Sequence, residues 1–146
     1  MSLTGSVVGG IAGDADGYVA YERIANGDFT AGDAQWDLAD AGWTISAGVA
    51  RTTEGAGGAS LVQSFAVIPS GRSAVLEFDV IGNTSVQNLR CYLTYEGAIV
   101  QTVITTTATT GTLSVPFTTV ANSDGIRFIV IEDAGVTTID NISLVV

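Results

Sequence analysis

Residues 125–146 read GIRFIVIEDAGVTTIDNISLVV, and this closing stretch is the most apolar and most regular part of the strand pattern. Apolar side chains occupy every second position from Ile126 to Val130, which is the period of a β-strand lying on a core. Residues 132–135 (EDAG) have turn chemistry, and residues 136–146 read as a second strand. The pattern predicts two strands joined as a hairpin. Because so apolar a hairpin is not stable alone in water, we expect it at the centre of a sheet.

The remainder of the chain repeats this strand-and-turn pattern. The sequence has 146 residues, 47% of them hydrophobic, which is enough for one domain with a real core. No window shows helical periodicity, and turn residues recur at intervals of roughly 8–12 residues. We therefore predict an all-β, single-domain jelly-roll β-sandwich of about eight to ten strands. Besides the closing pair and a short strand from residue 21, the expected strands are 43–45, 49–52, 59–67, 74–81, 89–95, 98–107 and 113–119.

The first 20 residues differ in composition from the rest of the chain. Residues 1–20 are rich in Gly and Ala, and we predict an N-terminal arm or an edge strand here, before a sandwich at residues 21–146. The segment lacks a basic start, and Gly9, Gly10 and Gly13 break its longest apolar run, so it resembles neither a signal peptide nor a membrane span. We expect a chain made in a cytoplasm without an encoded export route.

Charge and residue usage exclude several classes of function. All five basic residues are arginines, against fifteen Asp and Glu, giving a net charge of −10. This balance disfavours nucleic acid and anionic membranes as partners. The absence of histidine removes the commonest general base and zinc ligand. Glu77 and Asp79 lie side by side on one strand and cannot bracket a glycosidic bond, so we expect no enzyme. Cys91, the only cysteine, is predicted to be a buried, inert thiol.

Four segments carry a resemblance to a known group. They are residues 26–29 (NGDF) followed by Trp43, residues 58–63 (GASLVQ), residues 70–80 (SGRSAVLEFDV) and residues 138–144 (TIDNISL). In this order they resemble the jelly-roll carbohydrate-binding modules of the family 4/9/22 type, within the galactose-binding-like superfamily. The resemblance covers most of the chain after the N-terminal segment and implies a jelly-roll sandwich. Its motifs are more specific for fold than for ligand.

The resemblance also implies a structural calcium ion. In that group the ion is held by backbone carbonyls near the opening motif and the glycine turn, with an aspartate of the closing strand, and oxygen ligands of this kind suit Ca²⁺. Thr30 stands where the group usually has a glutamate, and Asn141 replaces a second aspartate. The alternative is that the closing aspartate hydrogen-bonds the neighbouring loop. By position, the implied calcium ligands are Asp140, Asp28, Gly55 and Gly57.

Sugar sites in that group use aromatic rings, with polar groups that read the sugar hydroxyls. Strand parity places Tyr92 with Arg90 and Thr94 on the face opposite Cys91, and a neighbouring set of polar side chains is predicted to share that face. Trp36 is a candidate in a loop. The alternative for Tyr92 is a half-buried strand tyrosine. The candidate carbohydrate-binding residues are Tyr92, Arg90, Thr94, Glu77, Asp79, Gln101, Arg127 and Trp36.

Two functions remain after these exclusions. The first is a non-catalytic display protein on a bacteriophage virion surface, as a capsid decoration or tail accessory protein, because jelly rolls recur in capsid proteins and lysis needs no export signal. Its partners would be other virion proteins or its own copies, through the N-terminal arm. The alternative is a conventional carbohydrate-binding module of a secreted, extracellular polysaccharide-degrading enzyme. A polysaccharide or cell-surface glycan is a candidate partner in either setting.

Overall fold

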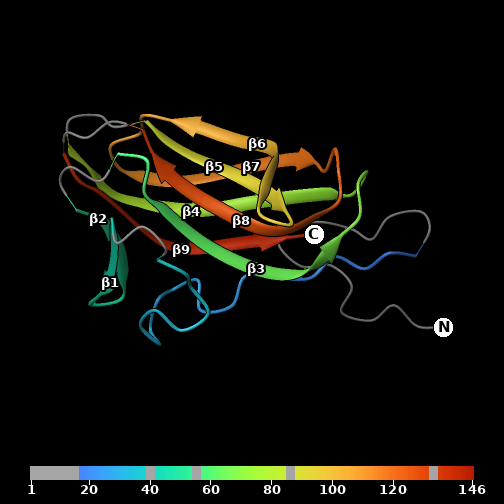
Figure 1. Cartoon of the computed structure of the whole chain (residues 1–146), viewed down its shortest axis with the longest axis horizontal. Coiled ribbons are helices and arrows are strands. Elements are labelled where there is room, and N and C mark those ends of the chain that lie inside the picture. Colours follow the sequence, from blue (N-terminus) through green and yellow to red (C-terminus); the bar gives the residue numbers. More distant parts are fainter. Residues whose placement is uncertain (1–16, 39–41, 54–56, 85–87, 132–134) are drawn as a thin grey trace.

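The computed structural model describes residues 17–38, 42–53, 57–84, 88–131 and 135–146. These residues form strands, turns and loops, and no α-helix (Figure 1). Within this part of the chain, therefore, no helix is available that is long and apolar enough to cross a membrane. The strands are β1 (Trp43–Ser46), β2 (Val49–Thr52), β3 (Ser60–Ile68), β4 (Ser73–Asn83), β5 (Leu89–Tyr95), β6 (Ala98–Thr106), β7 (Gly111–Thr118), β8 (Ser123–Val130) and β9 (Thr137–Val145).

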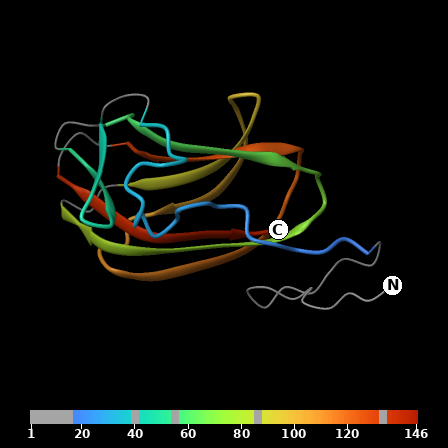
Figure 2. The same ribbon diagram turned by 90° about the horizontal axis from the view of Figure 1, so that it is seen from below.

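The strands form two sheets that face each other as layers (Figure 2). One sheet has five strands in the order β1-β2-β9-β4-β7, and the other has four in the order β3-β8-β5-β6. Every pair of neighbours is antiparallel. The predicted all-β sandwich is confirmed, and most strands begin and end within two residues of their expected positions.

The closing stretch departs from its prediction in one respect. β8 and β9 both form, but they do not pair as a hairpin, because β8 lies between β3 and β5 while β9 lies between β2 and β4. The chain crosses from one sheet to the other between them. Each strand is central in its own sheet, and the inner face of each is fully buried, as at Phe128 and Leu144. Alternation alone cannot distinguish a hairpin from two facing strands, since both bury every second residue.

A β-bulge in β9 changes which side chains face the core. Asp140 pairs with Asp79, whereas Ser143 pairs with Glu77, so β9 has one more residue than β4 in this interval. Asn141 sits in the bulge with a φ of 52°. A bulge of this kind reverses the alternation. After Ile139, the strand positions that face the main core are therefore 142 and 144, while Val145 is buried on the other side with Ala20. The expected continuous alternation over residues 136–146 is wrong.

The core fills the space between the two sheets. Phe78 of β4 and Phe128 of β8 meet edge to face, with ring centroids 5.3 Å apart, and so join the two layers. Trp43 is buried and donates from its indole nitrogen to the Ala59 carbonyl at 3.0 Å. Cys91 is also fully buried, as predicted, and burial raises the pKa of its thiol well above the ordinary value.

The described residues before β1 attach to the end of β9. Tyr21 and Val146 exchange backbone hydrogen bonds of 3.2 and 3.1 Å. The buried guanidinium of Arg23 donates to the main-chain oxygen of Val146 and to the hydroxyls of Tyr18 and Tyr21. The short strand expected from residue 21 is only an isolated bridge. The predicted arm lies largely in residues 1–16, outside the described residues.

Candidate functional site

The outer face of the four-stranded sheet carries a cluster of three polar side chains. Tyr92 of β5 lies directly opposite Arg127 of β8. Arg90, two residues before Tyr92, lies on the same face and opposite Ile129. The intervening Cys91 is buried in the core, as strand parity predicted. Pairing of two strands that are far apart in the sequence therefore builds this cluster, which we call the arginine–tyrosine cluster.

The two guanidinium groups of the cluster have few partners. Arg90 Nη1 donates to the Tyr92 hydroxyl at 3.4 Å, and Arg127 Nη2 donates to the Gly97 carbonyl at 3.3 Å. The Nε atoms of both arginines are buried without a hydrogen-bond partner. Among the described residues neither arginine forms an ion pair. Since each guanidinium has five N–H donors, the cluster has more donors than acceptors.

The turn between β5 and β6 stands beside this cluster. The backbone N–H of Glu96 donates to both carboxylate oxygens of Asp124, at 3.2 and 3.3 Å, while the neighbouring Gly97 accepts from Arg127. Figure 2 shows the turn projecting on the outer side of the four-stranded sheet. Two register shifts between β5 and β6 bend the ribbon here. Two residues of β8 thus hold the turn in place.

Tyr92 and Thr94 are more buried than a sugar-stacking site requires. Their exposed fractions are 8% and 4%, although both lie on the outer face. Thr94 pairs with Gly125, where a Cβ atom would lie 2.6 Å from the threonine hydroxyl. The Tyr92 ring is therefore not an open platform for a pyranose.

Three other predicted residues lie elsewhere. Glu77 and Asp79 are on the outer face of the five-stranded sheet, because β4 belongs to that sheet. Gln101 pairs with the inward-facing Leu93, and its side chain bonds the Thr118 carbonyl and the Val120 N–H. The bulges in β6 caused this change of side. The expectation that all three share a surface with Tyr92 is wrong.

Trp36 is a core residue rather than an exposed loop residue. Only 7% of its surface is exposed, and its indole N–H donates to the Asn26 carbonyl at 2.9 Å. Its ring lies 5.4 Å from the Phe29 ring. The loop that contains it folds back on itself, with the Asn26 side chain bonding the carbonyls of Gly32 and Ala34. Trp36 is thus unavailable for stacking on a sugar.

The opening and closing motifs of the resemblance meet in space. The N–H of Ile142 donates to the Gly27 carbonyl at 2.9 Å. The approach is so close that a Cβ atom on Gly27 would lie 1.9 Å from the Ile142 carbonyl oxygen. Next to it, Asp28 accepts from the backbone and hydroxyl of Thr30 at 3.2 and 2.9 Å, which holds the pKa of its carboxyl below the usual range.

The implied calcium ligands are only partly brought together. Burial raises the pKa of Asp140, and the negative charges of Asp79 and Asp28 add to the shift. Asp140 accepts from the N–H of the next residue of β9, Asn141, at 2.7 Å. Within the described residues, no group of three acidic, Cys or His side chains is placed to hold a metal ion. Gly55 lies outside the described residues and Gly57 lies in a turn, so calcium binding stays a prediction.

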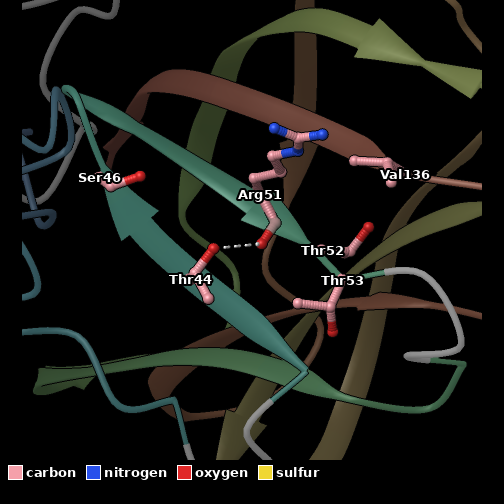
Figure 3. A pocket seen from close by; sticks show the side chains of 6 residues that line it. All are labelled: Thr44, Ser46, Arg51, Thr52, Thr53 and Val136. Carbon is pink, nitrogen blue, oxygen red and sulfur yellow. Dashed lines mark hydrogen bonds between the residues drawn. The ribbon is translucent and has the colours of Figure 1, made fainter.

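Sequence reasoning missed a pocket of about 400 Å³ beside the β1–β2 ribbon (Figure 3). Arg51, which is exposed, extends from β2, and Thr44 of β1 donates to the Arg51 carbonyl at 3.4 Å. The sequence did not predict the pocket because β1 and β2 have four residues each, too few for a distinctive pattern of alternation. The lining residues are Thr44, Ser46, Arg51, Thr52, Thr53 and Val136.

No protein-family model and no curated protein matches this sequence. Solved structures of similar fold do exist. One is the second N-terminal cellulose-binding domain of Cellulomonas fimi β-1,4-glucanase C, with a TM-score of 0.60 and 19% identity over 84% of this chain and 92% of that domain. Another is the K3 cleaved adhesin domain of Lys-gingipain from Porphyromonas gingivalis W83, with a TM-score of 0.62 and 14% identity over 86% and 98%.

A third similar structure is the enzymatically active domain of tailspike protein 4 of bacteriophage CBA120. Its TM-score is 0.65 with 18% identity, and the match covers 86% of this chain but only 21% of that one. At these identities the likeness concerns the fold alone. The chain therefore has the sandwich fold that carbohydrate-binding modules also have, in agreement with the resemblance in the sequence motifs.

Proposed function

We propose that the chain is a non-catalytic, glycan-binding display module whose ligand face is the outer face of the four-stranded sheet. The observation that carries this proposal is the arginine–tyrosine cluster. The cluster brings together a tyrosine hydroxyl and two guanidinium groups, whose N–H donors outnumber the acceptors around them. It lies on the same side of the sheet as the projecting β5–β6 turn. Sugar hydroxyls are recognised by convergent polar groups of this kind.

Recognition on this face relies on polar contacts and a narrow apolar strip. Thr102, which is exposed, pairs with Tyr92 and adds a hydroxyl group beside the cluster. Val62 of β3 lies opposite Arg127, and Ile129 lies opposite Arg90, and both apolar side chains are partly exposed. The C–H groups of a sugar ring can pack there while the guanidinium groups donate to its oxygens.

One setting for this module is the surface of a bacteriophage virion, as a capsid decoration or tail accessory protein. The sandwich fold shared with part of a bacteriophage tailspike supports this setting. So does the acidic, disulfide-free composition. The N-terminal segment would then bind other virion proteins or further copies of this chain, and the outer sheet face would meet the glycan.

The alternative setting is a conventional carbohydrate-binding module of a secreted polysaccharide-degrading enzyme. The shared fold with the cellulose-binding domain of a glucanase supports this alternative. The buried rings of Tyr92 and Trp36 weigh against it, because such modules rely on open aromatic surfaces. A particle-binding assay separates the two settings, since only a virion protein binds an undecorated capsid or tail.

A binding screen of the purified chain against soluble and insoluble polysaccharides tests the proposal. We expect at least one ligand whose binding is lost in the double variant Arg90→Gln, Arg127→Gln and kept in the matched control Glu77→Gln on the opposite sheet. Circular dichroism and the melting temperature would verify that each variant is folded. A folded wild-type protein that binds no polysaccharide would refute the glycan-binding function.

A further inference from the structure

We infer that the arginine–tyrosine cluster selects acidic glycans and that it binds the carboxylate of a uronic acid residue. This inference rests on the proposed glycan-binding function and names its ligand class. The cluster gathers two of the five basic residues of a chain whose net charge is −10. The placement of these two positive charges and the groups around them support an acidic ligand.

The two guanidinium groups are close neighbours on the sheet. Arg127 lies opposite Tyr92 and Arg90 lies opposite Ile129, so the two arginines are diagonal cross-strand neighbours. Such neighbours have backbone separations of about 7–8 Å, which long side chains easily span. Two positive charges at this spacing repel each other. Within the described residues, no carboxylate pairs with either of them.

The hydrogen-bonding state of the cluster also favours an anion. The two side-chain contacts of Arg90 and Arg127 are long, at 3.4 and 3.3 Å, and both buried Nε atoms lack an acceptor. An unpaired buried donor is unfavourable, so the cluster gains from an acceptor that reaches it. A planar carboxylate supplies two acceptor oxygens that match the fork of a guanidinium group.

Other polar groups at the site favour a sugar acid over a simple anion. The Gly97 carbonyl, the Tyr92 hydroxyl and the exposed Thr102 hydroxyl lie beside the arginines and can accept from or donate to sugar hydroxyls. A simple carboxylate without sugar hydroxyls would leave these groups without hydrogen-bond partners in the ligand. Asp79 and Asp140 lie on the opposite sheet face, where their charges would repel an acidic ligand. The carboxylate beside the cluster, that of Asp124, accepts from the Glu96 N–H rather than from either arginine.

The test compares an acidic oligosaccharide with its neutral counterpart by calorimetry. The probes are oligogalacturonate and oligomannuronate, and the methyl ester of each, which keeps the sugar backbone and removes the charge. We expect one of the acids to bind at least about tenfold more tightly than its ester. Arg90→Gln and Arg127→Gln should each reduce the affinity for the acid by a similar factor. The corresponding Lys variants, which keep charge but lose the fork, should recover it only in part.

The control is Arg51→Gln, which removes an exposed guanidinium from the five-stranded sheet and should leave binding unchanged. If the acid and its ester bind equally well, and the Arg90 and Arg127 variants bind neither, the selectivity for acidic glycans is overturned while the glycan-binding function stands. Loss of binding in Arg51→Gln alone would move the site to the β1–β2 pocket and overturn the assignment. If no acidic or neutral glycan binds to the folded protein, both the glycan-binding function and the acidic selectivity are overturned. If the protein self-associates and only the Arg127 variant abolishes this, the cluster binds a carboxylate from a second copy of the chain, and the glycan assignment is overturned.

Discussion

Tyr92 lies directly opposite Arg127 across β5 and β8, and its hydroxyl accepts a hydrogen bond from Arg90, two residues earlier on β5. Tyr92 thus lies beside both arginines and bonds one of them, while its own ring is almost completely buried. We propose that Tyr92 positions the Arg90 guanidinium rather than stacking on a sugar. The ring and the hydroxyl of this residue should therefore have separable effects on stability and on binding.

Tyr92→Ala should lower the free energy of unfolding by about 3 kcal/mol, because the substitution removes a buried ring. Tyr92→Phe keeps the ring and should change stability by less than about 1.5 kcal/mol, yet it should weaken glycan binding because Arg90 loses its acceptor. Denaturant unfolding and calorimetry measure the two effects. Tyr92→Ala with unchanged stability would contradict the buried placement of the ring.

Gly27→Ala should be strongly destabilising, because its Cβ atom would overlap the Ile142 carbonyl oxygen. The opening loop must then move away from β9, and we expect a loss of several kcal/mol, as for other severe overpacking. Gly82→Ala is the matched control, since nothing lies within 4 Å of its Cβ position. Equal melting temperatures for the two variants would show that the opening loop does not contact β9 in this way.

Asp140→Asn should raise the melting temperature at pH 7 in the presence of a chelator. Burial and the charges of Asp79 and Asp28 raise the pKa of Asp140 in the folded state, so its ionised form is unfavourable there. The wild-type protein loses this penalty as the pH falls through the raised pKa, and the advantage of the variant should disappear with it. We expect no more than about 1 kcal/mol, because solvent screens these groups.

Asp79→Asn should have the opposite effect on stability at neutral pH. Hydrogen bonds from Thr112 and Asn141, at 2.6 and 2.8 Å, lower the pKa of Asp79, so its ionised form stabilises the fold at neutral pH. This variant should lower the melting temperature at pH 7, and its disadvantage should vanish as the pH falls below the ordinary aspartate range. A pH series in which both variants shift stability in the same direction would show that the assigned causes are wrong.

Calcium binding, if it follows the motif resemblance, should raise the melting temperature in millimolar CaCl₂ relative to a chelator. The same Asp140→Asn variant should then lose the calcium effect, because it removes one ligand charge. Magnesium at equal concentration serves as the ionic control. No difference between calcium, magnesium and chelator in the wild-type protein would rule out the calcium site.

The N-terminal segment has a separate test. Deleting residues 1–16 should leave the melting temperature nearly unchanged, because the attachment at Tyr18, Tyr21 and Arg23 remains. If residues 1–16, the larger part of the arm predicted at residues 1–20, act as an arm, the same deletion should abolish self-association or binding to a virion particle, measured by sedimentation. A truncated chain that unfolds would contradict the arm interpretation.

The strands could be predicted because their alternation is local, whereas their arrangement depends on distant pairing. The alternation in residues 89–95 placed Tyr92 and Arg90 correctly on the outer face. It could not reveal that β4 lies in the other sheet, which separates Asp79 from Tyr92. Sheet membership is set by how the inner faces pack together, and no short segment encodes it.

Bulges and loop folding account for the other differences. The extra residue at Asn141 reverses the alternation of β9, and similar shifts in β6 turn Gln101 toward the sandwich interior. Trp36 is buried because its loop closes through hydrogen bonds to Asn26. In the sequence, Asn26 and its neighbours have only the composition of an ordinary turn, so this closure was not predicted. A bulge has no strong sequence signal, so side-chain direction beyond it was not predictable.

Nuclear magnetic resonance can show which face of the sandwich contacts the glycan. The glycan that binds in the screen would be titrated into isotope-labelled protein while the backbone amide shifts are followed. We predict that the largest changes fall on residues 90–94 and 125–129, with the side-chain N–H signals of Arg90 and Arg127 among them. Changes confined to the opposite face around Asp79, or to the β1–β2 pocket, would contradict the assignment of the ligand face.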